Sequence, residues 1–301
     1  MAKAYGLERA RKRIVIPFLL PALLLYTVIF FYPILRALWV SLHQWSGFGE
    51  PMKFIGLHNF RRMLGESIFW ESLVRTLSIT FFGGIGVFAI SMFFGILYQS
   101  SFKGIRTFRA IMFFPMIIPG IGVGIMWSFI YNVGWGPLSA LLKLAGLQAL
   151  DRVWLSPDYF MGSIIVMIIW VFAGYYITLL LAGLDKLPQS FYEVARIDGA
   201  SEFQVFFRIT LPMIRDVMMT AIILWIISSL KTFDLIVAIT FPTPPVSSYT
   251  LTVYIWQMAM GTFEPVFNLG YATALGVVLL LLVLAGFTVT RLIARRETIE
   301  Y

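Results

Sequence analysis

The sequence of 301 residues contains no cysteine and only two histidines. Without cysteine, neither disulfide bonds nor thiolate metal sites can form. The histidines, His43 and His58, stand apart from any cluster of carboxylates within an apolar run. The chain also lacks the Gly-x4-Gly-Lys-Ser/Thr phosphate loop, so it does not hydrolyse ATP itself. These absences argue against an enzyme, because no nucleophile, base or metal-binding set is left.

Charged residues are scarce as well. They make up 13% of the chain, and hydrophobic residues make up 59%, whereas soluble domains have about 25% and roughly 45–50%. A helix that crosses a bilayer needs about 20 apolar residues. We therefore predict an all-α, polytopic membrane protein in contact with membrane lipid, with one transmembrane domain over residues 1–301. Its six predicted spans are at about 14–38, 76–99, 107–131, 160–184, 213–237 and 267–291.

Two apolar segments are ambiguous. The first follows a basic N-terminal segment and resembles a signal peptide, but it is too long and no small-residue cleavage site follows it. We interpret it as an uncleaved first helix. The second runs from Leu235 to Phe263 and is interrupted by three prolines, Pro242, Pro244 and Pro245. Because proline disrupts helices, we expect a structured external loop here and not a seventh span.

The net charge of +8 does not indicate nucleic-acid binding, because its distribution follows the membrane. If the N-terminus is inside, the cytoplasmic segments contain fifteen of the 23 lysines and arginines. Those residues are Lys3, Arg9, Arg11, Lys12, Arg13, Lys103, Arg106, Arg109, Lys186, Arg196, Arg208, Arg215, Arg291, Arg295 and Arg296. The positive-inside rule then places both termini in the cytoplasm.

The cytoplasmic segment from Leu187 to Pro212 has the pattern of two short amphipathic helices. Ser190 and Glu193 have the spacing of a capping box at the start of the first helix. Gly199 supplies the break between the helices. Ala200 and Ser201 then open the second helix, and Pro212 is expected to begin the fifth span. The predicted apolar face of the second helix consists of Phe203, Phe206, Phe207 and Ile209. Such a face needs a partner surface.

The residues of this segment match a known pattern. Glu193 and Ala195 are followed, after three residues, by Gly199, and after nine more by Ile209 to Pro212. This resembles the Glu-Ala-Ala loop of the membrane subunits of binding-protein-dependent ABC importers, with Val194 in place of one alanine. Further stretches are similar to the sugar branch and its maltose-type first permease. They are Pro21 to Tyr26, Phe54 to Phe60, Phe108 to Pro115, Tyr192 to Ala200 and Phe233 to Asp234.

The resemblance implies a type I ABC importer permease fold in a bacterial or archaeal cytoplasmic membrane. It also implies a second homologous permease subunit, two ATPase subunits that bind ATP and Mg, and an external solute-binding protein. No cofactor is expected in this chain. Within the coupling loop 185–212, the resemblance gives Glu193, Ala195 and Gly199 a role in shaping the loop. It places Asp198, Ala200 and Ser201 at the ATPase contact. The alternative is that Glu193 merely caps a helix and the rest packs at the membrane interface.

Polar and aromatic residues inside the spans are candidates for the substrate pathway, because polar groups are costly in lipid. Sugars are bound by hydrogen bonds and aromatic platforms, and the resemblance places such contacts at Tyr175, Trp225, Ser228 and Ser229. Alternatively, these side chains form helix–helix hydrogen bonds, or Trp225 faces lipid or the partner permease. Lys231 and Asp234 have the spacing of a pair on one helical face, whereas an unpaired Lys231 would attract an anionic sugar.

Together these observations predict a permease subunit that imports a sugar or related polyol by ATP-driven alternating access. One alternative is a permease for an anionic sugar derivative or glycerol phosphate. The other is an ion-coupled secondary transporter, which usually has more spans and carboxylates near the membrane midplane.

Overall fold

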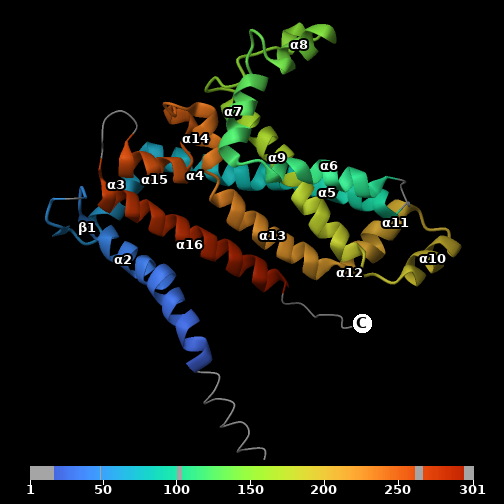
Figure 1. Ribbon diagram of the computed structural model, residues 1–301, viewed down its shortest axis with the longest axis horizontal. Coiled ribbons are helices and arrows are strands. Elements are labelled where there is room, and N and C mark those ends of the chain that lie inside the picture. The colour runs from blue at the N-terminus through green and yellow to red at the C-terminus, as the bar shows by residue number, and fades with distance from the viewer. Residues whose placement is uncertain (1–16, 48, 100–103, 262–266, 295–301) are drawn as a thin grey trace, which may run out of the picture.

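The computed structural model describes residues 17–47, 49–99, 104–261 and 267–294. In these ranges the chain is almost entirely helical, which confirms the predicted all-α class (Figure 1). The basic N-terminal residues, Lys103, Arg295 and Arg296 lie outside the described residues. Two short strands, β1 (His43–Gln44) and β2 (Lys53–Phe54), pair antiparallel. The α-helices are α2 (Tyr32–Ser41), α3 (His58–Gly65), α4 (Ser67–Ser78), α5 (Gly84–Gln99), α6 (Ile105–Ile117), α7 (Gly120–Ile130), α8 (Pro137–Leu144), α9 (Phe160–Leu184), α10 (Gln189–Ile197), α11 (Glu202–Val205), α12 (Leu211–Met213), α13 (Arg215–Leu230), α14 (Asp234–Thr240), α15 (Leu251–Met260) and α16 (Leu269–Ala294).

Five helical segments in the described residues are long and apolar enough to cross a membrane: Pro17–Ser41, Ser67–Leu97, Phe160–Leu184, Arg215–Thr240 and Leu269–Ala294. A sixth span results if the bent pair Thr107–Ile117 and Gly120–Ile130 counts as one. The helix over the predicted span 76–99 begins earlier, at Ser67, because α4, a π-helical turn at Ile79–Gly83 and α5 are continuous.

Helix α9 is the centre of the bundle. It packs against α5 on one side and α6 on another (Figure 1). Glycines at both contacts allow the helices to come close. A Cβ added at Gly174 of α9 would lie 1.7 Å from the carbonyl oxygen of Met112 in α6. A Cβ added at Gly86 of α5 would lie 2.3 Å from Ile169. Small residues allow such backbone contact between membrane helices, where water provides no driving force for association.

Two spans are broken, one at its middle and the other towards its end. The pair α6 and α7 bends by 99° at Ile118 and Pro119, because the residue before a proline favours extended backbone, and Ile118 has φ −71° and ψ 131°. The other break, between α13 and α14, lies at residues 231–233. The halves that follow the breaks, α7 and α14, pack side by side (Figure 1). A Cβ added at Gly124 would lie 2.5 Å from Ala238, so this contact is also close.

The proline-containing segment after α14 folds back onto the bundle. Its helix α15 has ten residues, about half the length that a span requires. The backbone N–H of Leu251 donates to Thr76 Oγ1 at 2.9 Å, and Arg75 donates to the carbonyl of Val246 at 3.0 Å. The segment is therefore a structured connection, as the sequence predicts. At the other side of the bundle, the first span projects away from the body below α2 (Figure 1).

Gly174 gives a direct test of the α6–α9 contact. Gly174→Ala forces a methyl group onto the Met112 backbone, and overpacking of this kind typically costs about 1–3 kcal/mol. Gly162→Ala on the same helix is the matched control, because nothing lies within 4 Å of its added Cβ. We expect Gly174→Ala alone to lower the unfolding temperature of the purified protein in detergent. Equal unfolding temperatures for the two variants would contradict this packing.

Candidate coupling and translocation sites

The break at Gly199 ends helix α10. Its φ of +75° lies in the left-handed region that favours glycine. The N–H of Ala200 donates to the carbonyl of Ala195 at 3.0 Å, which closes the end of the helix in the manner of a Schellman motif. No atom lies within 4 Å of a Cβ added at Gly199. Backbone conformation, and not crowding, therefore accounts for glycine at this position.

Ser201 begins the second helix through a capping box. Its Oγ accepts from the N–H of Gln204 at 3.3 Å, and the Gln204 side chain accepts from the N–H of Ser201 at 2.9 Å. The spacing of Ser190 and Glu193 predicts such a box for α10, but α10 begins at Gln189 and Ser190 therefore lies inside the helix. Ser201 and Gln204 have the same spacing in the sequence.

The phenylalanines of this helix do not share one face, contrary to the sequence prediction. Phe206 is only 1% exposed and lies against Gly95 of α5, where an added Cβ would be 2.9 Å from its ring. The ring centres of Phe203 and Phe207 lie 4.5 Å apart with the ring planes tilted by 43°, and both residues are exposed. Residues four apart share a helix face, so Phe203 and Phe207 lie together, while Phe206, directly before Phe207, faces the bundle. A π-helical turn at Phe206–Thr210 then departs from the usual 3.6-residue period.

The sequence predicts that Pro212 begins the fifth span, and this prediction is wrong. Pro212 lies in the first turn of α12, where the missing N–H of proline is tolerated. The chain stays helical through this residue, and the irregularity comes at Ile214, with φ −94° and ψ 17°. The coupling loop is thus joined to α13 by an almost continuous helical path.

A hollow of about 320 Å³ lies at the break of this loop. It brings together Asp198 and Ala200, two of the three predicted ATPase-contact residues, with Gly199, which was predicted to shape the loop, and it is also lined by Gln204, Val205, Arg208 and Ile209. Glu193, Ala195 and Ser201 do not line it; Ala195 is buried, and the other two are exposed. Beside the break, Ile197 is 83% exposed, and Val194 is exposed as well.

Among the predicted pathway residues, Trp225 and Ser229 hold helices together. Trp225 is 2% exposed, and its Nε1 donates to the carbonyl of Thr80 at 2.8 Å. Ser229 donates from Oγ to Thr80 Oγ1 at 3.0 Å. The Trp225 ring fills the space left by two glycines, because an added Cβ would lie 2.9 Å from it at Gly83 and 2.6 Å from its Nε1 at Gly84. These contacts favour the helix-packing alternative for both residues.

Tyr175 and Ser228 are only partly buried. Ser228 donates to the carbonyl of Leu224 in its own helix at 2.7 Å. The rings of Tyr175 and Tyr176 meet edge to face at 5.0 Å, and the Tyr176 ring meets Trp225 at 5.8 Å. The candidates therefore lie along one contact between α9 and α13, with the buried Tyr176 between them.

Lys231 and Asp234 do not share a helical face. Lys231 follows the end of α13, and Asp234 begins α14, so the break between these helices separates them. The described residues contain no ion pair between the two. The spacing of three residues predicts a pair only in an unbroken helix, and this one is broken.

A polar cluster at the other end of the bundle was not predicted. Glu66, between α3 and α4, accepts hydrogen bonds from Tyr254 at 2.8 Å and Tyr271 at 2.5 Å. Its other oxygen pairs with Arg62 Nε at 2.7 Å, and the Arg62 guanidinium lies 4.6 Å from the Tyr271 ring centre. Burial raises the pKa of the Glu66 carboxyl, but the hydrogen bonds from Tyr271, Arg62 and Tyr254 together outweigh it and lower that pKa below its ordinary value. Only the tertiary fold brings these residues together.

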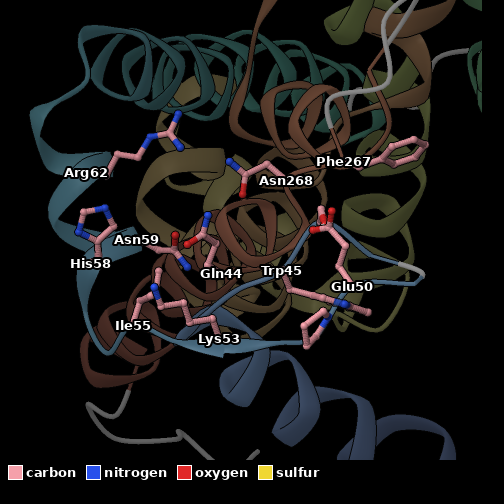
Figure 2. A pocket seen from close by; sticks show the side chains of 12 residues that line it. Gln44, Trp45, Glu50, Lys53, Ile55, His58, Asn59, Arg62, Phe267 and Asn268 are labelled. Atoms are coloured by element: carbon pink, nitrogen blue, oxygen red, sulfur yellow. The ribbon is translucent and has the colours of Figure 1, made fainter.

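A second hollow, of about 550 Å³, adjoins this cluster (Figure 2). Polar side chains from β1, α3 and the segment before α16 gather around it, and Trp45 and Glu50 lie on one side (Figure 2). It lies at the end of the bundle opposite α10 and α11 (Figure 1). Its lining residues are Gln44, Trp45, Ser46, Glu50, Pro51, Lys53, Ile55, His58, Asn59, Arg62, Phe267 and Asn268.

Comparison with known proteins identifies relatives over most of the chain. The family model described as "Binding-protein-dependent transport system inner membrane component" matches residues 87–299. The trehalose/maltose transport system permease protein MalF of Thermococcus litoralis is 33% identical over 223 residues, covering 74% of this chain and 75% of the relative. The diacetylchitobiose uptake system permease protein NgcF of Streptomyces coelicolor is 32% identical over 271 residues, covering 85% and 75%. The sulfoquinovosyl glycerol transport system permease protein SmoG of Agrobacterium fabrum is 31% identical over 263 residues, covering 87% and 83%.

Among solved structures, a chain of the bacterial alginate ABC transporter in complex with its alginate pentasaccharide-bound periplasmic protein has a TM-score of 0.78 to this chain. The match covers 97% of this chain and 98% of the other, at 20% identity. At that identity the likeness bears on the fold alone, and it confirms the fold that the sequence resemblance implies.

Proposed function

This chain belongs to the family of inner membrane components of binding-protein-dependent transport systems, and we propose that it imports a carbohydrate or related polyol delivered by an external solute-binding protein. The observation that carries the proposal is the family match over residues 87–299, which includes the whole segment from Leu187 to Pro212. As a member of this family the chain is a transport subunit. In the proposal, a second homologous permease completes the pathway, and two partner ATPase subunits bind ATP and Mg.

The carbohydrate class is supported by the relatives, whose names refer to trehalose and maltose, to diacetylchitobiose and to sulfoquinovosyl glycerol. A neutral oligosaccharide is the first candidate. An anionic sugar derivative is the second, because Lys231 is exposed and forms no ion pair with Asp234 in the described structure.

The proposed orientation places α10 and α11 in the cytoplasm together with both termini. It follows from the positive-inside rule. The exposed apolar side chains beside the break, Ile197, Phe203 and Phe207, then face the ATPase subunits. Large apolar side chains exposed together mark a surface that a partner protein covers. Asp198, Gly199 and Ala200 form the hollow into which the partner surface fits, while Glu193, Ala195 and Ser201 shape the loop.

The energy source for uptake, ATP hydrolysis or an ion gradient, distinguishes this function from secondary transport. We expect vesicles that contain both permeases and the ATPase subunits to accumulate sugar when ATP and the loaded binding protein are supplied. Vesicles without the ATPase subunits should accumulate none, because this chain has no phosphate loop. Uptake driven by an ion gradient in their absence would refute the proposal. Offering a neutral sugar and its phosphorylated derivative in the same assay decides between the two substrate candidates.

Gly199 tests the coupling role. Valine at φ +75° costs roughly 1–2 kcal/mol, because left-handed backbone crowds its Cβ, whereas asparagine adopts this conformation more readily. A cost of that size changes a two-state equilibrium about five- to thirtyfold. We expect Gly199→Val to lower the sugar transported per ATP hydrolysed by about this factor, with normal insertion into the membrane, and Gly199→Asn to have a much smaller effect. Unchanged coupling in Gly199→Val would count against the assignment.

For the substrate pathway we propose that Tyr175 and Ser228 face the passing sugar, and that Trp225 and Ser229 position their helix. Tyr175→Ala should reduce transport while the complex still assembles and unfolds at the normal temperature. Trp225→Phe removes the donor to Thr80 and should lower stability by about 1 kcal/mol, with Trp135→Phe, at an exposed position, as its control. If Tyr175→Ala destabilises the complex as much as Trp225→Phe does, Tyr175 is a packing residue.

A further inference from the structure

The hollow beside Arg62 is separate from the candidate pathway. Its walls come from β1, β2, α3 and the residues before α16. Tyr175, Trp225, Ser228 and Ser229 do not line it. It lies at the end of the bundle that faces outward in the proposed orientation, opposite α10 and α11 (Figure 1). A surface in this place is available to a partner outside the membrane.

The floor of this hollow is preformed. The amide nitrogen of Asn59, a buried residue, donates to the carbonyls of Ser41 at 2.9 Å and His43 at 3.0 Å. The N–H of Gly270 donates to the carbonyl of Trp45 at 3.0 Å, and a Cβ added at Gly270 would lie 2.1 Å from the His43 oxygen. The hairpin and the start of α16 are thus held together at backbone distance. A rigid site of this kind loses little conformational entropy when a partner binds.

The charge of the lining indicates the chemistry of the partner. Four lining side chains are ionisable, and three of them, Lys53, His58 and Arg62, are basic, while Glu50 is acidic. Arg62 already forms an ion pair with Glu66, which does not line the hollow. Lys53 and His58 are exposed and form no ion pair with any described residue. A carboxylate from a partner would complement them, as oppositely charged patches do across protein interfaces.

We infer that this hollow is a docking site for an acidic side chain of the solute-binding protein, inserted between the β1–β2 hairpin and the start of α16. The inference rests on the proposed function, which supplies an external protein partner. Arg62 connects the hollow to the bundle. It forms an ion pair with Glu66 at the start of α4, and Glu66 accepts a hydrogen bond from Tyr271 of α16. A protein seated there is connected through these bonds to two helices, α4 and α16, although no residue of either helix lines the hollow.

The test uses the absence of cysteine, since Lys53→Cys provides the only thiol of this chain. Lys143→Cys on α8, at an exposed lysine outside the hollow, is the matched control. The complete complex in nanodiscs is labelled with a maleimide, with and without its cognate solute-binding protein. We expect docking to slow labelling at position 53 about tenfold and to leave position 143 unchanged.

Charge reversal gives a second measurement. Lys53→Glu should raise the binding-protein concentration that half-maximally stimulates ATP hydrolysis by about tenfold, because like charges then face each other. Lys143→Glu should leave it unchanged. Equal labelling of position 53 with and without the binding protein, under stimulation, would overturn the inference. So would protection of position 53 by free sugar alone, which would make the hollow a sugar site. If the binding protein never stimulates the unmodified complex, the proposed function itself fails, and the inference fails with it.

Discussion

The approach of helix backbones at α9 is the contact on which the rest of the structure depends. In lipid, apolar side chains gain nothing from leaving their solvent, so helices associate through close packing and hydrogen bonds. Gly174 lets α6 approach α9 at its Met112 carbonyl, and Gly86 lets α5 approach from another side. Once α5 and α6 are fixed, the positions of Trp225 and of the coupling loop follow, because both pack against the helix that contains α5.

Three breaks interrupt the helices of this bundle. The left-handed Gly199 separates α10 from α11, and the breaks after Ile117 and Leu230 create the pair of α7 and α14. The first break has its local cause in glycine and the second in Pro119. Broken spans are tolerated in a membrane only where protein covers the freed backbone groups. Here α7 and α14 cover one another, with Gly124 against Ala238.

The sequence predicts much of this fold because its strongest signals are local. Apolar runs, the positions of basic residues and the spacing from Glu193 to Pro212 all act over short stretches. What it could not predict depends on register or on distance. Phe206 is buried whereas Phe203 and Phe207 are exposed, and the break at residues 231–233 separates Lys231 from Asp234. Glu66 meets Tyr254 and Tyr271 only through the fold, since 188 and 205 residues separate it from them in the sequence.

One helix links the two ends of the molecule. It begins directly after Glu66, and its second half contains Gly95, against which Phe206 of the coupling loop lies. Between them, at the π-helical turn, Thr80 receives hydrogen bonds from Trp225 and Ser229 of α13, the helix into which the coupling loop continues. The loop is therefore attached to this helix twice, once directly and once through α13. Packed helices are not continuously deformable. A displacement of the loop therefore acts on this helix both directly, at Gly95, and through α13. The π-helical turn that contains Thr80 is where the helix is least regular.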